Sequence, residues 1–273
     1  MWKIKGLCAL LGLLIVIIDA QAQSDYCDPK LCPSYNQPQR QHIGCRNNGQ
    51  FGAECTRDAE IVPMDDRKMN LFLKVHNRLR DRFARGKIKT FKQAAKMPML
   101  KWNDELAKLA EYNVRTCIFE HDQCRSTSAC PWAGQNLGYV SSWPKFQDVN
   151  FVIKNTTREW FYEYRFASQQ NTNNYTTGNV GNEQIGHFTA FIHEKSDKVG
   201  CAVSKFTTKD GMKKYLVACN YCYTNMLYES TYTTGKACSK CQNGKCGEIY
   251  KGLCDESEVV DPIPDILKKN SRG

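Results

Sequence analysis

Apolar residues recur at helical spacing in three parts of the chain, and each part predicts an amphipathic helix. The first helix is expected to begin near Asp65-Asp66 and to end at Gly86, because an acidic start and a glycine stop mark its two ends. Its apolar stripe comprises Met69, Phe72, Leu73, His76, Leu79 and Phe83. The second helix follows the capping residue Asn103, and its apolar positions are Leu106, Leu109, Ala110 and Val114.

The third predicted helix runs from about Phe146 to Phe166. Its apolar stripe comprises Val149, Val152, Ile153, Thr156 and Trp160. Glu163 continues this stripe three residues beyond Trp160. Burying an unpaired carboxylate costs several kcal/mol, so Glu163 requires a partner, which the pattern alone does not identify.

Residues 187–193 alternate between two faces in a way that is typical of a β-strand. This interpretation places His187 and His193 on one face of the strand, roughly 20 Å apart, because a strand rises about 3.3 Å per residue. One metal ion could not bridge both histidines at that distance. We therefore expect His193 to be an exposed residue at the strand end, and His76 to pack at a helix edge.

Two further strands are predicted over residues 199–204 and 215–221, with Asp210-Gly211 at the centre of their connection. Asp-Gly supplies the positive φ angles that a tight hairpin turn requires. Because Cys201 and Cys219 lie almost symmetrically about this dipeptide, a hairpin places them opposite each other and allows a disulfide. Helices combined with three or four antiparallel strands predict an α+β fold.

Residues 1–22 have the features of a secretory signal peptide. Lys3 and Lys5 precede an apolar run, and Ala20-Gln21-Ala22 provides a small-residue cleavage site. The run is well short of the ~20 residues of a membrane span, so we expect a soluble, secreted protein. Cleavage removes Cys8 and leaves fourteen of the fifteen cysteines. An even number in an oxidising compartment predicts disulfides rather than zinc–thiolate sites.

The distribution of cysteines divides the mature chain into four parts. Residues 23–65 and 227–254 are rich in cysteine and lack sustained apolar periodicity, so disulfides must hold them. Residues 66–226 carry the predicted helices and strands and form the main domain, whereas residues 255–273 predict a flexible polar tail. Asn155 and Asn174 each begin an N-glycosylation sequon, which a secreted protein can use.

Three blocks resemble the signature segments of the CAP superfamily, which comprises cysteine-rich secretory, antigen 5 and pathogenesis-related 1 proteins. These blocks are Gly186-His187-Phe188-Thr189-Ala190-Phe191, Gly200-Cys201 and Leu216-Val217-Ala218-Cys219-Asn220-Tyr221. The resemblance covers roughly residues 66–226 and is strongest to the antigen 5-like proteins of insects. It implies an α–β–α sandwich with a small antiparallel sheet, a disulfide-tied N-terminal arm and a C-terminal cysteine-rich extension.

The resemblance also implies four disulfides, namely Cys27–Cys45, Cys32–Cys124, Cys55–Cys117 and Cys201–Cys219. Six cysteines remain without an assigned partner: Cys130, Cys222, Cys238, Cys241, Cys246 and Cys254. The extension that carries the last four is much shorter than the channel-blocking domain of the vertebrate secretory proteins. A channel toxin is therefore not expected.

In proteins of this family, an acid three residues after the helical tryptophan faces a cleft with two histidines and a second acid. Carried over to this sequence, the first acid is Glu163, the histidines are His121 and His187, and Gln135 stands where the second acid would be. Two histidines and two acids could bind zinc or activate water, but glutamine neither titrates nor acts as a base. The alternatives are a buried hydrogen-bond network, a weak Zn²⁺ site and, least favoured, a catalytic centre.

The formal net charge is +10, and many of the positive charges lie between Arg67 and Lys101. Four of them fall at helical spacing opposite the apolar stripe of the first helix: Lys74, Arg78, Arg82 and Arg85. They form either a solvated helix face or a contact for heparan sulfate or for anionic lipid headgroups. A nucleic-acid partner is not expected, since the chain has no nucleic-acid-binding motif.

These observations predict a secreted, non-enzymatic protein that needs no cofactor and binds an extracellular protein or a small, apolar, lipid-like ligand. One alternative is a metal-dependent hydrolase that uses His121, Glu163 and His187. Another is a structural or reproductive-tract interaction protein whose cleft is idle.

Overall fold

The computed structural model describes residues 25–33 and 38–264, and it confirms the α+β sandwich. The predicted signal peptide and the end of the predicted tail lie outside the described residues. A central sheet has the strand order β1-β6-β7-β3, and β2 pairs in parallel with β6. Its strands are β1 (Glu60–Ile61), β2 (Lys101–Trp102), β3 (Gly134–Ser142), β6 (Lys198–Thr207) and β7 (Lys213–Tyr221).

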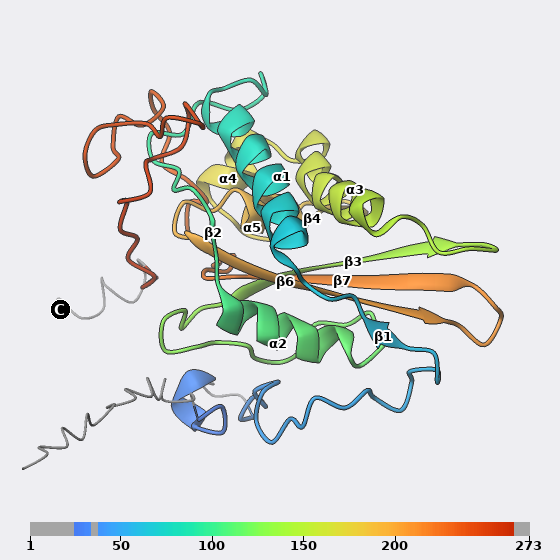
Figure 1. Ribbon diagram of the computed structural model, residues 1–273. Helices are drawn as coiled ribbons and strands as arrows, with labels where there is room; N and C mark the ends of the chain where they lie inside the picture. The colour runs from blue at the N-terminus through green and yellow to red at the C-terminus, as the bar shows by residue number, and fades with distance from the viewer. Residues whose placement is uncertain (1–24, 34–37, 265–273) are drawn as a thin grey trace, which may run out of the picture.

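Helices cover both faces of this sheet (Figure 1). One face carries α2 (Asp104–Val114), and the other carries α1 (Asp66–Ala84), α3 (Val149–Tyr162) and α5 (Gly186–Phe191). The short elements are helix α4 (Gln169–Asn173), strands β4 (Asn179–Val180) and β5 (Glu183–Gln184), and 3₁₀ turns at Pro29–Leu31 and Glu163–Arg165. Among the described residues, no helix combines the length and apolar character that a membrane crossing requires.

Local sequence signals account for the starts of the three long helices. The side chains of Asp65, Asn103 and Asp148 each accept a hydrogen bond from a first-turn backbone amide of α1, α2 and α3, respectively. The third helix is shorter than predicted at both ends, because it begins at Val149 after the capping residue Asp148, and its end tightens into the 3₁₀ turn that begins at Glu163. Gly86 has a φ of 68°, which agrees with its predicted role just after the first helix.

The hairpin of β6 and β7 has the predicted register. Cys201 lies directly opposite Cys219, and the two form a disulfide. Gly211 in the connecting turn has a φ of 86°, a conformation that a side chain disfavours. Strand β3 pairs with the free side of β7 along its whole length and provides the third long strand of the sheet.

The predicted strand over residues 187–193 is wrong, because most of this segment forms helix α5. Alternation and helical spacing are hard to distinguish over so few residues, and Phe188, Phe191 and Ile192 also satisfy an i, i+3, i+4 pattern. All three side chains are fully buried. The expectation of an exposed His193 is wrong as well, since this side chain is only 1% exposed and packs on Tyr223.

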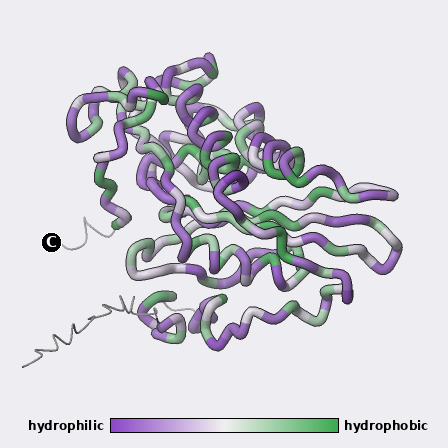
Figure 2. The backbone as a smooth tube through the Cα atoms, in the orientation of Figure 1, coloured by the Kyte–Doolittle hydropathy of each residue, from purple (hydrophilic) through white to green (hydrophobic). Residues whose placement is uncertain are grey.

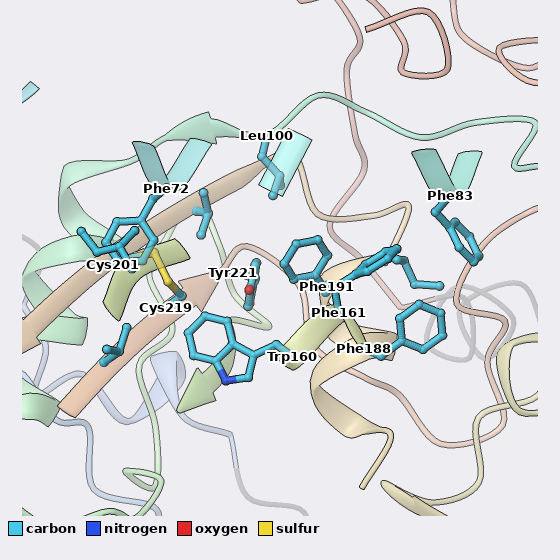
Figure 3. Close-up of a cluster of buried hydrophobic side chains, with 14 of the residues drawn as sticks. Phe72, Phe83, Leu100, Trp160, Phe161, Phe188, Phe191, Cys201, Cys219 and Tyr221 are labelled. Carbon is cyan, nitrogen blue, oxygen red and sulfur yellow. A yellow bond between two sulfur atoms is a disulfide. The ribbon is translucent and has the colours of Figure 1, made fainter. Parts of the chain in front are cut away.

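Helix α5 places aromatic side chains in the middle of the core between the helices and the sheet (Figure 3). The ring of Phe188 contacts those of Phe83 and Phe161, with centroid distances of 5.7 and 5.8 Å. Phe191 stacks on His76 at 4.5 Å, so His76 lies in the core rather than at a helix edge. This packing explains why tertiary contacts override the strand-like pattern of the segment.

Seven disulfides connect the described cysteines. The structure contains the four pairs implied by the family resemblance, together with Cys130–Cys222, Cys238–Cys246 and Cys241–Cys254. The N-terminal arm runs along the outer side of α2 (Figure 1), where Cys32–Cys124 and Cys55–Cys117 join it to the domain. The C-terminal extension contacts the end of α1, because the Gly252 amide donates to Asp81.

Candidate functional site

His121, Gln135 and His187 line a single cleft of about 440 Å³. Each comes from a different element, namely the loop after α2, strand β3 and the start of α5. The other lining residues are mostly polar: Arg125, Asn136, Tyr175, Gly178, Asn179, Gln184, Gly186, Thr224 and Asn225. The fold therefore brings together the two histidines and the glutamine that the family resemblance implied.

Glu163 lies behind His187 and holds it in place. One carboxylate oxygen, Oε1, accepts a hydrogen bond from Nδ1 of His187 at 2.6 Å. The other, Oε2, accepts from the backbone amides of His187 and Phe188 at 3.0 and 3.1 Å. These amides are at the N-terminus of α5, which has no capping side chain of its own. The partners that Glu163 required are thus the imidazole of His187 and the backbone amides at the start of α5.

The contact with Glu163 selects the tautomer of a neutral His187 ring. An ionised carboxylate only accepts hydrogen bonds, so Nδ1 of a neutral His187 carries the proton. Its Nε2 atom then keeps a lone pair. A carboxylate that orients a histidine in this way is a common arrangement behind histidines that bind metal ions.

His121 has a similar arrangement with an amide in place of the acid. Its Nδ1 atom donates to Oε1 of Gln135 at 2.7 Å, which leaves the lone pair on Nε2. The Gln135 amide nitrogen donates to Asp122 at 2.8 Å and to Asn220 at 3.0 Å. Partial burial lowers the pKa of His121, while its hydrogen bond to Gln135 acts in the opposite direction. The neutral form of His121 is therefore favoured.

This network explains why an amide suits position 135. A glutamate there would direct a carboxylate oxygen at Oδ2 of Asp122 and at Oδ1 of Asn220, both of which now accept hydrogen bonds from Gln135. Like charges at such a distance repel strongly. The neighbouring Asp122 thus favours glutamine over a second acid in this cleft.

A buried polar chain connects the floor of the cleft to α1, and sequence reasoning missed it. Asn136 donates to the backbone carbonyl of His187 and to the hydroxyl of Tyr221, at 3.1 and 3.2 Å. The Tyr221 hydroxyl in turn donates to Nε2 of His76 at 2.9 Å, and Nδ1 of His76 donates to the Phe72 carbonyl. The presence of His76 on the apolar stripe of the first helix could have indicated this buried hydrogen-bond network, because a buried imidazole needs polar partners.

His76 makes the stability of the fold sensitive to acid. Complete burial lowers its pKa to about 3, whereas an unfolded chain has a histidine pKa near 6.5. Between these values the unfolded state binds a proton that the folded state excludes, so stability is present above pH 6.5 and is lost as the pH falls. We expect a contribution of about 1.4 kcal/mol per pH unit from this one group.

Urea unfolding of the wild type and of His76→Gln between pH 6.5 and 5 measures this contribution. The variant should be less stable at pH 7, but its stability should fall less steeply with pH, by about 1.4 kcal/mol per unit. The comparison cancels the effect of the other histidines, which are common to both proteins. Equal slopes would show that His76 does not carry the acid sensitivity.

The other predicted positions lie outside the cleft. Asn174 is exposed just after α4, whereas Asn155 is half-buried within α3 and Thr157 of its sequon is fully buried. His42 is buried in the N-terminal arm and stacks on Tyr26. The four basic residues predicted as a possible polyanion contact are exposed on α1 and at its C-cap.

Within the described ranges, two clusters bring three metal-ligating side chains close together. They are Cys32, His42 and Cys124, and Cys241, Cys254 and Glu258. Their cysteines are all disulfide-bonded and provide no thiolate. The cleft differs from a closed metal site, because it offers two imidazoles with carboxylate or amide support behind them.

Comparisons with known proteins identify the family to which the chain belongs. Residues 73–221 match the model of the "Cysteine-rich secretory protein family" (CAP). The chain is 38% identical to "Venom allergen-1" of Aedes albopictus over 94% of this chain and 96% of that protein. It is 45% identical to "Antigen 5 like allergen Cul n 1" of Culicoides nubeculosus, over 70% of this chain and 88% of the relative.

A solved structure, that of NaASP2 with Zn²⁺, has the same fold. It matches with a TM-score of 0.58 and 26% identity, over 74% of this chain and all of NaASP2. The family model spans more than half of the chain, and the mosquito and midge relatives extend the likeness over most of it. The chain therefore belongs to the cysteine-rich secretory protein (CAP) family and is similar to its antigen 5-like, venom allergen-1 members in insects.

Proposed function

We propose that this protein acts outside the cell as a binding protein without catalytic activity, and that its cleft takes Zn²⁺ on His121 and His187. The observation that carries the proposal is the pair of oriented imidazoles. Glu163 and Gln135 each engage the Nδ1 atom of one histidine, so both Nε2 atoms keep the lone pairs that bind a metal ion. The matching structure NaASP2 was determined with Zn²⁺, which supports this choice of metal.

The donor set supports weak metal binding. Neutral imidazole is a good ligand for Zn²⁺, but a structural zinc site normally has four protein ligands and a catalytic one has three. The cleft offers two, and water would complete the coordination. Bound zinc would supply a Lewis acid, and the two histidines would hold it without a protein carboxylate in direct contact.

Among the described cleft residues, no unengaged carboxylate remains to act as a general base once zinc occupies both imidazoles, which argues against zinc-dependent hydrolysis. Both oxygens of Glu163 already accept hydrogen bonds from His187 and from the start of α5. Gln135 cannot take up a proton in the relevant pH range. The polar lining also makes the cleft a poor site for an apolar ligand, so we assign binding of an extracellular protein partner to the surface of the molecule.

Isothermal titration calorimetry with ZnCl₂ at pH 7.5 tests the zinc proposal. We expect one weak site in the wild type and at least tenfold weaker binding in His187→Ala. Glu163→Gln should weaken binding by about 10- to 100-fold, because it removes the support of His187 without removing a ligand. Affinity should also fall as the pH is lowered, because metal binding requires neutral imidazoles and protons compete with the metal for them.

Gln184→Ala is the matched control, since Gln184 is exposed and lines the same cleft but is not an imidazole. Its zinc affinity should equal that of the wild type. Equal affinity in wild type and His187→Ala, or no binding in either, would overturn the zinc site. Zinc-dependent hydrolysis of ester or peptide substrates that Glu163→Gln abolishes would instead support the hydrolase alternative.

A further inference from the structure

The outer face of α1 and the residue just after it carry a row of basic side chains, which we call the basic stripe: Lys74, Arg78, Arg82 and the C-cap residue Arg85. All four are exposed. At 3.6 residues per turn they fall within roughly 80° of the helix circumference, and they extend over roughly 17 Å of its length. In Figure 2, hydrophilic residues colour much of the visible side of this helix.

The charges of the stripe are poorly neutralised by the protein itself. Lys74, Arg78 and Arg82 form no ion pair with any described residue, and Arg85 pairs with Asp81 at 2.7 Å. Lys74, Arg78 and Arg82 are four residues apart, a spacing at which like charges destabilise a helix. By contrast, α2 and its cap place Glu111 and Arg115 at the same spacing with opposite charges. Helix stability therefore does not account for the stripe.

Neighbouring segments extend the positive surface beyond α1. Lys87 and Lys89 are exposed just after the helix. Lys251 of the C-terminal extension is also exposed, and the adjacent Gly252 amide donates to Asp81 within α1. The disulfides of the extension thus help to hold a further cation near the stripe.

We propose that the basic stripe binds a sulfated glycosaminoglycan of the heparan sulfate type. A straight row of charges on a convex helix matches a linear polyanion, whose sulfate groups arginine can engage with its planar fork. A membrane surface fits less well. Helices that lie on membranes insert apolar side chains, but none of the large exposed apolar residues in the described ranges belongs to α1.

Chromatography on immobilised heparin tests this proposal. The wild type should elute well above about 0.15 M NaCl, whereas Arg78→Glu/Arg82→Glu should elute near or below that concentration. The matched control is Lys145→Glu/Lys209→Glu, which changes the net charge equally at two exposed lysines outside α1. It should elute close to the wild type. All three proteins should have the same melting temperature, because the changed side chains are on the surface.

The salt dependence and two comparison ligands complete the experiment. The affinity of the wild type for heparin should fall steeply with salt, and the slope of log affinity against log salt should drop by roughly two in the stripe variant. Desulfated heparin should not retain the wild type. Equal elution shifts for both double variants would overturn the proposal, as would binding to vesicles with 30% phosphatidylserine in the absence of heparin binding. Zinc binding should be unchanged in both variants, so failure here is distinct from failure of the cleft site.

Discussion

Replacing Arg80 by Met is expected to lower the free energy of unfolding by about 3–5 kcal/mol or more. Arg80 is on α1 and is fully buried. Its Nη1 atom donates to the carbonyls of Phe191 and His193, and its Nη2 atom donates to those of Pro98 and Ser196. Methionine fills a similar volume but leaves four buried acceptors without these donors.

Replacing Arg80 should also disturb the position of His187 in the cleft, because Arg80 holds the end of α5 against α1. Its guanidinium ties α1 to the last residue of α5 and to the segment that follows, and the second residue of α5 is the cleft residue His187. Burial lowers its pKa to about 9, so the group remains charged at neutral pH. No described carboxylate forms an ion pair with it. Four backbone carbonyls, together with the more distant charge of Asp197, stabilise this cation, which makes the four hydrogen bonds difficult to replace.

The urea midpoint at pH 7, with disulfides intact, measures the effect. Arg78→Met is the matched control, because Arg78 is exposed on the same helix. Its stability should change by no more than about 0.5 kcal/mol. If Arg80→Met does not fold, Arg80→Lys keeps the charge but loses the planar fork, and it should still be clearly less stable than the wild type. If Arg80→Lys and Arg80→Met both unfold at the same urea concentration as the wild type, the four hydrogen bonds to carbonyls contribute little to the free energy of unfolding.

Gly200→Ala is expected to destabilise the fold by about 3 kcal/mol or more. Gly200 is on β6, directly beneath the first turn of α2. A Cβ atom there would come within 2.2 Å of the Ala107 nitrogen and 2.4 Å of the Asn103 oxygen. Both are backbone atoms, so neither can rotate away. The helix would have to move off the sheet. The free-energy cost of this movement exceeds the usual cost of adding one methyl group to a packed core.

Gly247→Ala serves as the control for this substitution. A Cβ atom at Gly247 would meet its nearest neighbours at 3.7 Å, which is an ordinary packing distance. We expect a change of no more than about 0.5 kcal/mol in the urea unfolding experiment. A loss below about 1 kcal/mol for Gly200→Ala would mean that α2 can shift on the sheet at little cost.

Some features of this protein follow from short stretches of sequence. The starts of α1 and α2 are set by Asp65 and Asn103, whose side chains each accept a hydrogen bond from the backbone amide three residues later. The pairing of Cys201 with Cys219 follows from a turn placed midway between them. Such features depend on neighbours along the chain, so periodicity and turn chemistry are sufficient to predict them.

Family resemblance added the cleft residues, but their hydrogen bonding required the tertiary structure. The sequence indicated that Glu163 needs a partner, and the fold provides one in the N-terminus of α5. The same packing explains the wrong strand prediction. A short segment with Phe188 and Phe191 can bury its aromatic rings as a strand or as a helix, and the surrounding core selects the helix.

Arg80 shows most clearly what sequence alone could not determine. Helical spacing places it on the buried face of α1, four residues after His76, but its charge is typical of an exposed position. Four carbonyls from two distant segments make its burial favourable. Local sequence thus determined the three long helices, the hairpin and its disulfide. Only the tertiary structure decided the state of α5, the partner of Glu163 and the burial of Arg80, because each depends on groups that come together when the chain packs.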